Sequence, residues 1–164
     1  MADRISFWAW GLESEEPTDA QRAALARQLS ERYGVAITPR PVPNLADAQL
    51  RAPRITPPDS IAGCCSTDTY ERARFAYGAH FTDRTRAFNL DFPNPPDVVA
   101  HPATDAELEA VLDWCHSAGH VAVPYGGGSS VVWGANPPEG ADGIVTISMD
   151  RFDRVLEVDA TSRA

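Results

Sequence analysis

The most informative part of the sequence, residues 97–130, reads DVVAHPATDAELEAVLDWCHSAGHVAVPYGGGSS. Residues 98–100 are a short β-branched run between prolines, which is typical of a buried strand. Thr104 and Glu107 then form a capping box that predicts the start of a helix. Apolar side chains follow at the spacing of one helical face: Leu108, Val111, Leu112 and Cys115. Residues 121–123 form the next strand, and the crossover between the two strands is long enough for them to lie parallel.

A loop rich in glycine and serine follows this second strand directly. Its residues are Pro124, Tyr125, Gly126, Gly127, Gly128, Ser129 and Ser130. Because glycine has no Cβ, successive backbone N–H groups can converge there on an anion, and the two serine hydroxyls can help. The loop lacks both the lysine of a nucleotide triphosphatase loop and the G-x-G-x-x-G spacing of a Rossmann domain. Taken alone, it is better interpreted as a surface turn without a ligand.

The order of these segments resembles the FAD-binding domain of the family that includes vanillyl-alcohol oxidase, para-cresol methylhydroxylase (PCMH) and alkyldihydroxyacetonephosphate synthase. The stretches that carry the resemblance are PDVVAHP, DWCHSAG, HVAVP and YGGGSSVVWG. Upstream, WAWGLE, CSTDTYERARFAYG and FPNPPDVVAHP are similar to bacterial members of the synthase-like branch. The resemblance implies an α+β fold in which residues 93–164 are the N-terminal portion of a PCMH-type FAD-binding domain. Residues 1–92 would be a helical, proline-rich arm.

In that family the glycine loop contacts the FAD pyrophosphate, so the resemblance implies that residues 124–130 bind the cofactor. Many relatives attach FAD covalently through a histidine in a loop of the form R-S-G-G-H-S. Here Ser129 follows Gly128 where that histidine would lie, so the resemblance implies non-covalent FAD.

The resemblance also implies a function for a longer parent protein. That parent would be a flavin-dependent oxidoreductase, or a synthase-like relative, that acts on a small organic substrate, and a homodimer is one candidate for its assembly. The family's remaining FAD contacts, its substrate-binding domain and its catalytic residues would come after Ala164, so we expect this piece to be inactive alone. We assign no catalytic residue. The alternative hypothesis is a stand-alone, non-catalytic module that binds a nucleotide or another protein.

Other local patterns predict further elements. A capping box and a closing glycine favour a helix over residues 18–33. Six prolines within residues 38–60 favour an extended connector and not a core. A second helix is expected over residues 66–78, and two strands over residues 143–148 and 155–159.

The overall charge and hydropathy limit the partners of the chain. Its formal net charge is −9, and no run of lysine or arginine interrupts that acidity, so nucleic acid is a poor partner. The first residues do not resemble a signal peptide, and no stretch of about 18 apolar residues predicts a membrane span. A cytoplasmic location is the default expectation.

Several sets of reactive side chains show no spacing that indicates a catalytic or metal site. Three cysteines are interpreted as reduced thiols: Cys64, Cys65 and Cys115. Four scattered histidines are expected to be structural or solvated: His80, His101, His116 and His120. Four clustered arginines are expected to form a solvated face, with an electrostatic role near an anionic substrate as the alternative: Arg72, Arg74, Arg84 and Arg86. Two tryptophans near the N-terminus are expected to anchor the arm by packing: Trp8 and Trp10.

Overall fold

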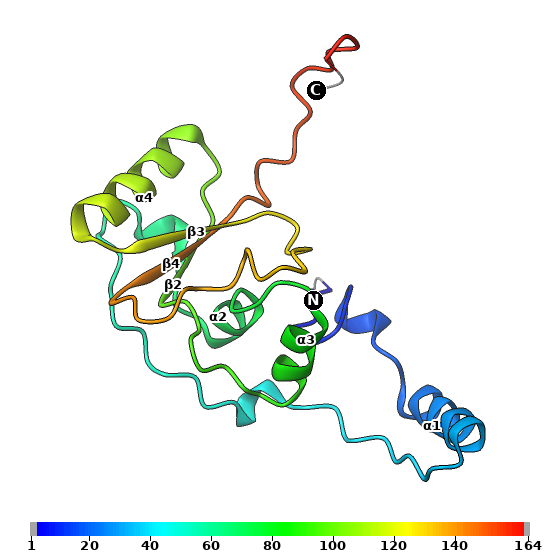
Figure 1. The fold of residues 1–164 in the computed structure, drawn as a ribbon. Helices are drawn as coiled ribbons and strands as arrows, with labels where there is room; N and C mark the ends of the chain where they lie inside the picture. Colours follow the sequence, from blue (N-terminus) through cyan, green and yellow to red (C-terminus); the bar gives the residue numbers. More distant parts are fainter. Residues whose placement is uncertain (1–2, 163–164) are drawn as a thin grey trace.

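A computed structural model describes residues 3–162 and is built around one mixed sheet (Figure 1). Its strands are β1 (Cys65–Ser66), β2 (Val98–Ala100), β3 (Val121–Tyr125) and β4 (Ile144–Ser148). Their order across the sheet is β1-β2-β4-β3. The strands β2 and β3 are parallel, as predicted, but they do not pair with each other because β4 lies between them and runs parallel to both. The strand β1 pairs antiparallel with β2.

The helix α4 (Asp105–Ala118) covers one face of this sheet, opposite α2 and α3 (Figure 1). Its buried side chains Val111 and Cys115 join a core cluster with residues of β2 and β4. Cys115 is therefore a small core side chain, as its place on the apolar stripe predicts. Leu112, in contrast, is 44% exposed, so the predicted stripe was wrong at that position. The covered face is narrower than the spacing of the four apolar residues suggests.

The N-terminus of α4 is capped by Thr104, whose hydroxyl accepts a hydrogen bond of 3.2 Å from the Glu107 backbone N–H. The Glu107 carboxylate accepts from the backbone N–H of Ala103 at 2.7 Å, one residue before the cap. One of the two hydrogen bonds of the predicted capping box is thus formed. In the other, the Glu107 carboxylate accepts from Ala103 and not from Thr104. The helix ends at Gly119, in the left-handed conformation with φ of 71°.

On the opposite side of the sheet, α2 (Thr69–Arg74) lies against β2, and α3 (Phe81–Phe88) packs beside α2, with Ala87 and Ala73 in a second core cluster. The helix expected over residues 66–78 forms only over Thr69–Arg74, so its predicted end near Gly78 was wrong: the chain leaves the helical conformation at Phe75. The Phe75 ring is fully buried against Val99 of β2 and the ring of Tyr125, whose centroid lies 4.6 Å away. The sequence showed no conventional capping residue for α3, whose N-cap is His80.

The N-terminal arm contains the predicted helix α1 (Asp19–Tyr33), with the Thr18 and Gln21 capping box fully formed. Short 3-10 turns occur at Glu13–Glu15, Leu45–Asp47 and Ala62–Cys64. Apart from the second of these turns and a short bend and turn, residues 38–60 have no regular secondary structure, in keeping with their prolines. Trp8 packs edge-on against Phe88 of α3 at 5.0 Å between ring centroids, so one of the two tryptophans acts as an anchor. Trp10 is 65% exposed.

A fully buried carboxylate, Asp97, ties the arm to the sheet. It accepts hydrogen bonds from the guanidinium groups of Arg51 and Arg54, and at 2.9 Å from each of the backbone N–H groups of Arg54 and Ile144. Burial alone would raise the pKa of Asp97, but these hydrogen bonds outweigh it and hold the pKa well below its usual range. The proline-rich segment therefore contributes two cations to the base of the sheet.

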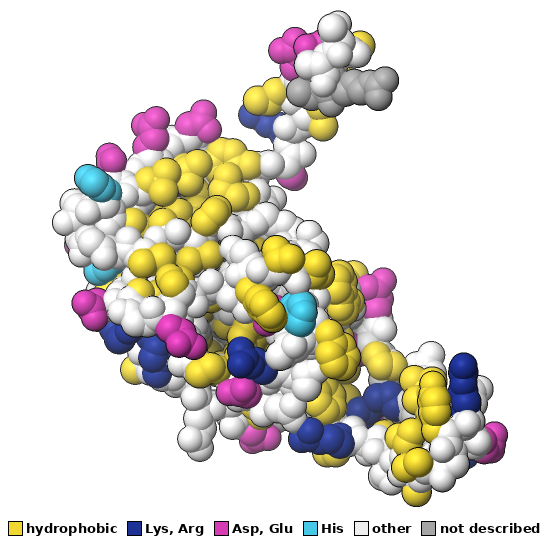
Figure 2. Space-filling view, viewed as in Figure 1, with side chains coloured by type: hydrophobic (Ala, Val, Ile, Leu, Met, Phe, Trp, Pro, Cys, Tyr) yellow, Lys and Arg dark blue, Asp and Glu magenta, His cyan; other side chains and the backbone are white. Residues whose placement is uncertain are grey.

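The strand expected over residues 155–159 was wrong. After β4 the chain runs clear of the body (Figures 1 and 2), and Val155, Leu156 and Val158 are 80%, 86% and 76% exposed. Alternating apolar residues satisfy a strand pattern, but a strand also needs a partner for its backbone groups, and residues 155–159 pair with no strand among residues 3–162.

Candidate functional site

The glycine loop lies at the carboxyl ends of the parallel strands. It follows β3 directly, and the backbone carbonyl of Tyr125 accepts a hydrogen bond of 2.9 Å from the N–H of Met149, the residue after β4. This edge is where open sheets with parallel strands bind their ligands. The position of the loop therefore follows from the predicted strand, helix, strand order.

The backbone amides of this loop are free. Across residues 3–162, the N–H groups of residues 126–130 donate to no other protein group. A Cβ built on Gly126 or Gly127 meets nothing within 4 Å, so the space in front of these two glycines is open. Consecutive unpaired N–H groups on an open, side-chain-free bend fit a phosphate or diphosphate group.

Gly128 is held differently, by a buried tyrosine. It has φ of +67°, and a Cβ at this position would lie 2.7 Å from both Cε1 and Cζ of Tyr125, and closer still to the hydroxyl oxygen. The Tyr125 side chain is buried beneath the loop and donates a hydrogen bond of 3.0 Å to the Tyr77 carbonyl. Burial raises the pKa of Tyr125. Among the predicted site residues, Tyr125 thus supports the loop from below.

The two serines and the proline of the loop have distinct surroundings. The Ser130 hydroxyl accepts a hydrogen bond of 3.0 Å from the Gly134 N–H, and the Ser130 carbonyl accepts one of 2.7 Å from the Ala79 N–H. Ser129 is exposed and lines a cavity beside the loop, and Pro124 is exposed on β3. Of the predicted contact residues, four line this one cavity: Tyr125, Gly127, Gly128 and Ser129.

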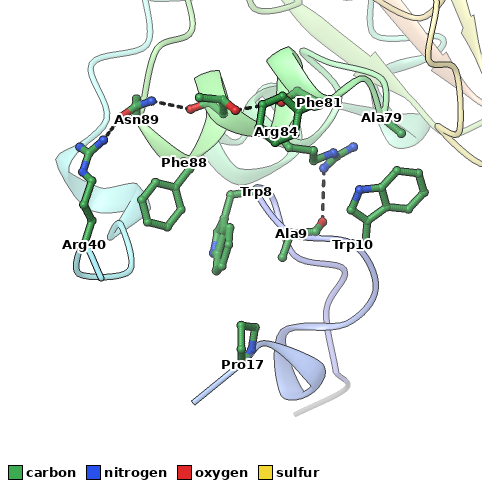
Figure 3. A pocket seen from close by; sticks show the side chains of 11 residues that line it. Trp8, Ala9, Trp10, Pro17, Arg40, Ala79, Phe81, Arg84, Phe88 and Asn89 are labelled. Carbon is green, nitrogen blue, oxygen red and sulfur yellow. Dashed lines mark hydrogen bonds between the residues drawn. The ribbon is translucent and has the colours of Figure 1, made fainter. Parts of the chain in front are cut away.

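This cavity has a volume of about 90 Å³ and lies between the glycine loop, α2, α3 and the N-terminal turn. Its other walls include Arg74, Arg84 and Trp10. A larger apolar groove of about 630 Å³ adjoins it and shares Trp10 and Arg84 (Figure 3). The two arginines were missed as site residues because nothing in their spacing shows that the chain turns at Phe75 and brings α2 and α3 to the loop.

The arginine cluster is consequently not the solvated face that was expected. Arg72 is only 3% exposed and donates to the backbone carbonyls of Pro96 and Arg51 at 2.8 and 2.6 Å. Arg86 is the one that fits the expectation, since its side chain is 48% exposed and lies 3.8 Å from Asp91.

A histidine with two acidic neighbours lies at the same edge of the sheet. His101 follows β2, and its Nε2 atom is 2.8 Å from the Glu71 carboxylate, while its Nδ1 atom is 3.6 Å from Asp150. The hydrogen bond with Glu71 raises the pKa of His101 despite partial burial. The arrangement joins α2, β2 and the turn after β4.

Within the part of the chain that the structure describes, no three histidine, cysteine or acidic side chains are grouped as metal ligands. In the same part, no helix combines the length and the apolar character that crossing a bilayer requires.

Comparison with known proteins gives consistent matches. Residues 96–164 match a protein family described as FAD binding domain. The chain is 30% identical over 97 residues to alkyldihydroxyacetonephosphate synthase of Trypanosoma brucei brucei, which is 58% of this chain and 16% of that protein. It is also 30% identical over 92 residues to the enzyme of that name from Dictyostelium discoideum, which is 56% of this chain and 15% of that protein.

Solved structures agree on the fold. Two crystal forms of alkyldihydroxyacetonephosphate synthase, P1 and P212121, superpose on 96% of this chain with TM-scores of 0.77 and 0.76, at 18% and 19% identity. The chain spans 34% and 33% of those structures. The α+β fold and the likeness to the N-terminal portion of a PCMH-type FAD-binding domain are confirmed.

Proposed function

Because residues 96–164 of this chain match the FAD binding domain family, we propose that residues 124–130 hold the diphosphate of FAD in a flavin-dependent enzyme similar to alkyldihydroxyacetonephosphate synthase. The family match confirms FAD as the cofactor that the resemblance implies. The free amides of residues 126–130 are the observation that carries the assignment of the loop. They offer the diphosphate several hydrogen bonds without a lysine.

Different residues of the loop contribute to diphosphate binding in different ways. Gly126 and Gly127 leave room for close approach, and Ser129 adds a hydroxyl on the same side. Gly128 sets the bend, and Tyr125 fixes it from beneath through its bond to the Tyr77 carbonyl. Bound FAD would supply redox chemistry at its isoalloxazine ring, while the protein supplies binding, orientation and electrostatics.

Several finer features belong to the same proposal. Residues 93–164 would be the incomplete FAD-binding domain and residues 1–92 the arm, which adds β1 to the edge of the sheet. Ser129 stands where a covalent histidine would lie, which supports non-covalent attachment. The parent would be an oxidoreductase or synthase that acts on a small organic substrate, with a homodimer as its candidate assembly and the cytoplasm as its compartment.

Flavin binding tests this function directly. The purified chain is titrated with FAD and with riboflavin, which lacks both phosphates, and binding is followed by quenching of flavin fluorescence and by equilibrium dialysis. We expect FAD to bind more tightly than riboflavin, because only FAD presents a diphosphate to the loop. Equal binding of the two flavins, or no binding of FAD, would contradict the assignment.

A further inference from the structure

The glycine loop supplies hydrogen-bond donors but no full positive charge. Residues 124–130 contain no lysine or arginine, and the chain as a whole carries a formal charge of −9. A dinucleotide diphosphate is an anion that such a surface repels over a distance comparable to the Debye length. The site therefore needs a local source of positive charge that the loop does not contain.

We propose that Arg74 and Arg84 form the cationic half of the diphosphate site, facing the glycine loop across the cavity that they share with Gly127, Gly128 and Ser129. This inference rests on the proposed function, since it names two further residues of the same site. The two arginines come from α2 and α3, and the loop follows β3, so three elements far apart in sequence converge on one cavity.

Arg74 is held at the cavity without using its hydrogen-bond donors. Its guanidinium carbon lies 4.4 Å from the centroid of the Phe75 ring, and Phe75 in turn packs edge-on against Tyr125 beneath the loop. Among residues 3–162, the Arg74 side chain has no carboxylate partner and no hydrogen-bond acceptor. A guanidinium stacked on an aromatic face keeps its planar fork of N–H groups available for a phosphate.

Arg84 is fixed in place but not neutralised. It donates to the Gly78 carbonyl and, at 3.4 Å, to the Ala9 carbonyl, and its guanidinium lies beside Trp10 (Figure 3). Its Nε atom is buried and lacks a hydrogen-bond partner within the described chain. No carboxylate of residues 3–162 forms a salt bridge with it. A buried donor without an acceptor, on a cation without a counterion, is a costly arrangement that an anion in the cavity would relieve.

The other two arginines of the cluster show that this arrangement is not general. Arg86, on the same helix as Arg84, lies 3.8 Å from Asp91 and lines a different cavity. Arg72 satisfies its donors with buried carbonyls. Only the pair that borders the glycine loop combines partial burial with the lack of an acidic partner, and Arg86→Gln therefore serves as a matched control.

The ligand chemistry that this pair selects is a diphosphate, carried by FAD or free as inorganic pyrophosphate. The test measures the affinity for FAD, inorganic pyrophosphate and riboflavin of three proteins: the unsubstituted chain, Arg74→Gln and Arg86→Gln. We expect Arg74→Gln to weaken binding of FAD and of pyrophosphate about tenfold, the size of one charge-assisted hydrogen bond, and to leave riboflavin unchanged. Arg86→Gln should change none of the three.

Arg84 also donates hydrogen bonds to two backbone carbonyls, so removing its charge altogether could unfold the chain. A conservative substitution is therefore used at this position. Arg84→Lys keeps the positive charge but removes the planar set of guanidinium N–H donors. It should therefore weaken FAD and pyrophosphate binding severalfold while the far-ultraviolet circular dichroism spectrum stays unchanged. If the unsubstituted chain and Arg74→Gln bind FAD equally well, the proposed role of the two arginines is refuted and the proposed function stands. If pyrophosphate binding depends on Arg74 but FAD does not bind, the flavin assignment falls and the anion site stands.

Discussion

Replacing Gly128 with alanine should separate the folding role of the glycine loop from its binding role. Gly128 has φ of +67°, where an alanine is strained by about 1–2 kcal/mol. The new methyl group would also lie 2.7 Å from two atoms of the Tyr125 ring, which is 5% exposed.

The magnitude follows from what Tyr125 would have to give up. Moving its ring costs about 1–3 kcal/mol of overpacking, and loss of its hydroxyl bond to the Tyr77 carbonyl costs about 1 kcal/mol more. Together with the backbone strain, we expect Gly128→Ala to lower the free energy of unfolding by about 3–6 kcal/mol. With a urea slope of about 1–3 kcal/mol/M, the unfolding midpoint should fall by roughly 2 M.

The assay is urea unfolding followed by tryptophan fluorescence, with Gly127→Ala as the matched control. A Cβ at Gly127 meets nothing within 4 Å, so this neighbour should keep its stability to within about 1 kcal/mol. Gly127→Ala should nevertheless weaken FAD binding, because Gly127 lines the cavity beside the loop and the methyl group takes up space at the anion site. Equal stability of the two variants would refute the claim that Tyr125 supports the loop at Gly128.

Three further measurements test other parts of the structure. Asp97→Asn should cost about 2–3 kcal/mol in urea unfolding, since it removes the fully buried charge that accepts hydrogen bonds from the two partly exposed arginines, and a loss below about 1 kcal/mol would exclude that role. The low native pKa of Asp97 means that its stabilisation is present above the unfolded pKa of about 4 and is lost as the pH falls through the native value. The raised pKa of His101 has the opposite sign: its stabilisation is complete below the unfolded pKa of about 6.5 and is lost as the pH rises through the native value, and an NMR titration should show that Glu71→Gln lowers the native pKa. Burial raises the pKa of Cys65 to about 12, so its alkylation by iodoacetamide at neutral pH should be slow in the folded chain and fast in urea, whereas equal rates would contradict the burial.

Local patterns predicted the elements whose signals are complete within a few residues. The caps at Thr18 and Thr104, the buried run of β2 and the glycines after β3 each appear where the sequence indicated. Elements that depend on a distant partner were not predictable in this way. The strand β1 is two residues long and exists because Cys65 pairs with Ala100. Residues 155–159 alternate in the same way as a strand but have no pairing partner within residues 3–162.

The candidate site shows the same difference between features encoded in neighbouring residues and features that depend on distant ones. The glycine loop was predicted because its chemistry lies in consecutive residues. Arg74 and Arg84 were assigned to a solvated face, because their approach to the loop requires the break at Phe75 and the burial of its ring. Asp97 is separated from Arg51 by 46 residues of sequence and from Arg54 by 43. Hydrophobic periodicity cannot predict contacts between residues so far apart.

The central place of β4 has a consequence for how the chain reaches this structure. Among the strands of residues 3–162, Ile144–Ser148 comes last in the sequence, yet β3 pairs with it alone and β2 has it as its parallel partner. Until it arrives, the peptide that bears the glycines is attached to an unpaired segment and has no defined position. Its insertion also brings the Ile144 N–H to Asp97, so we expect the sheet to close in one late, cooperative event that positions the glycine loop and docks the arm together.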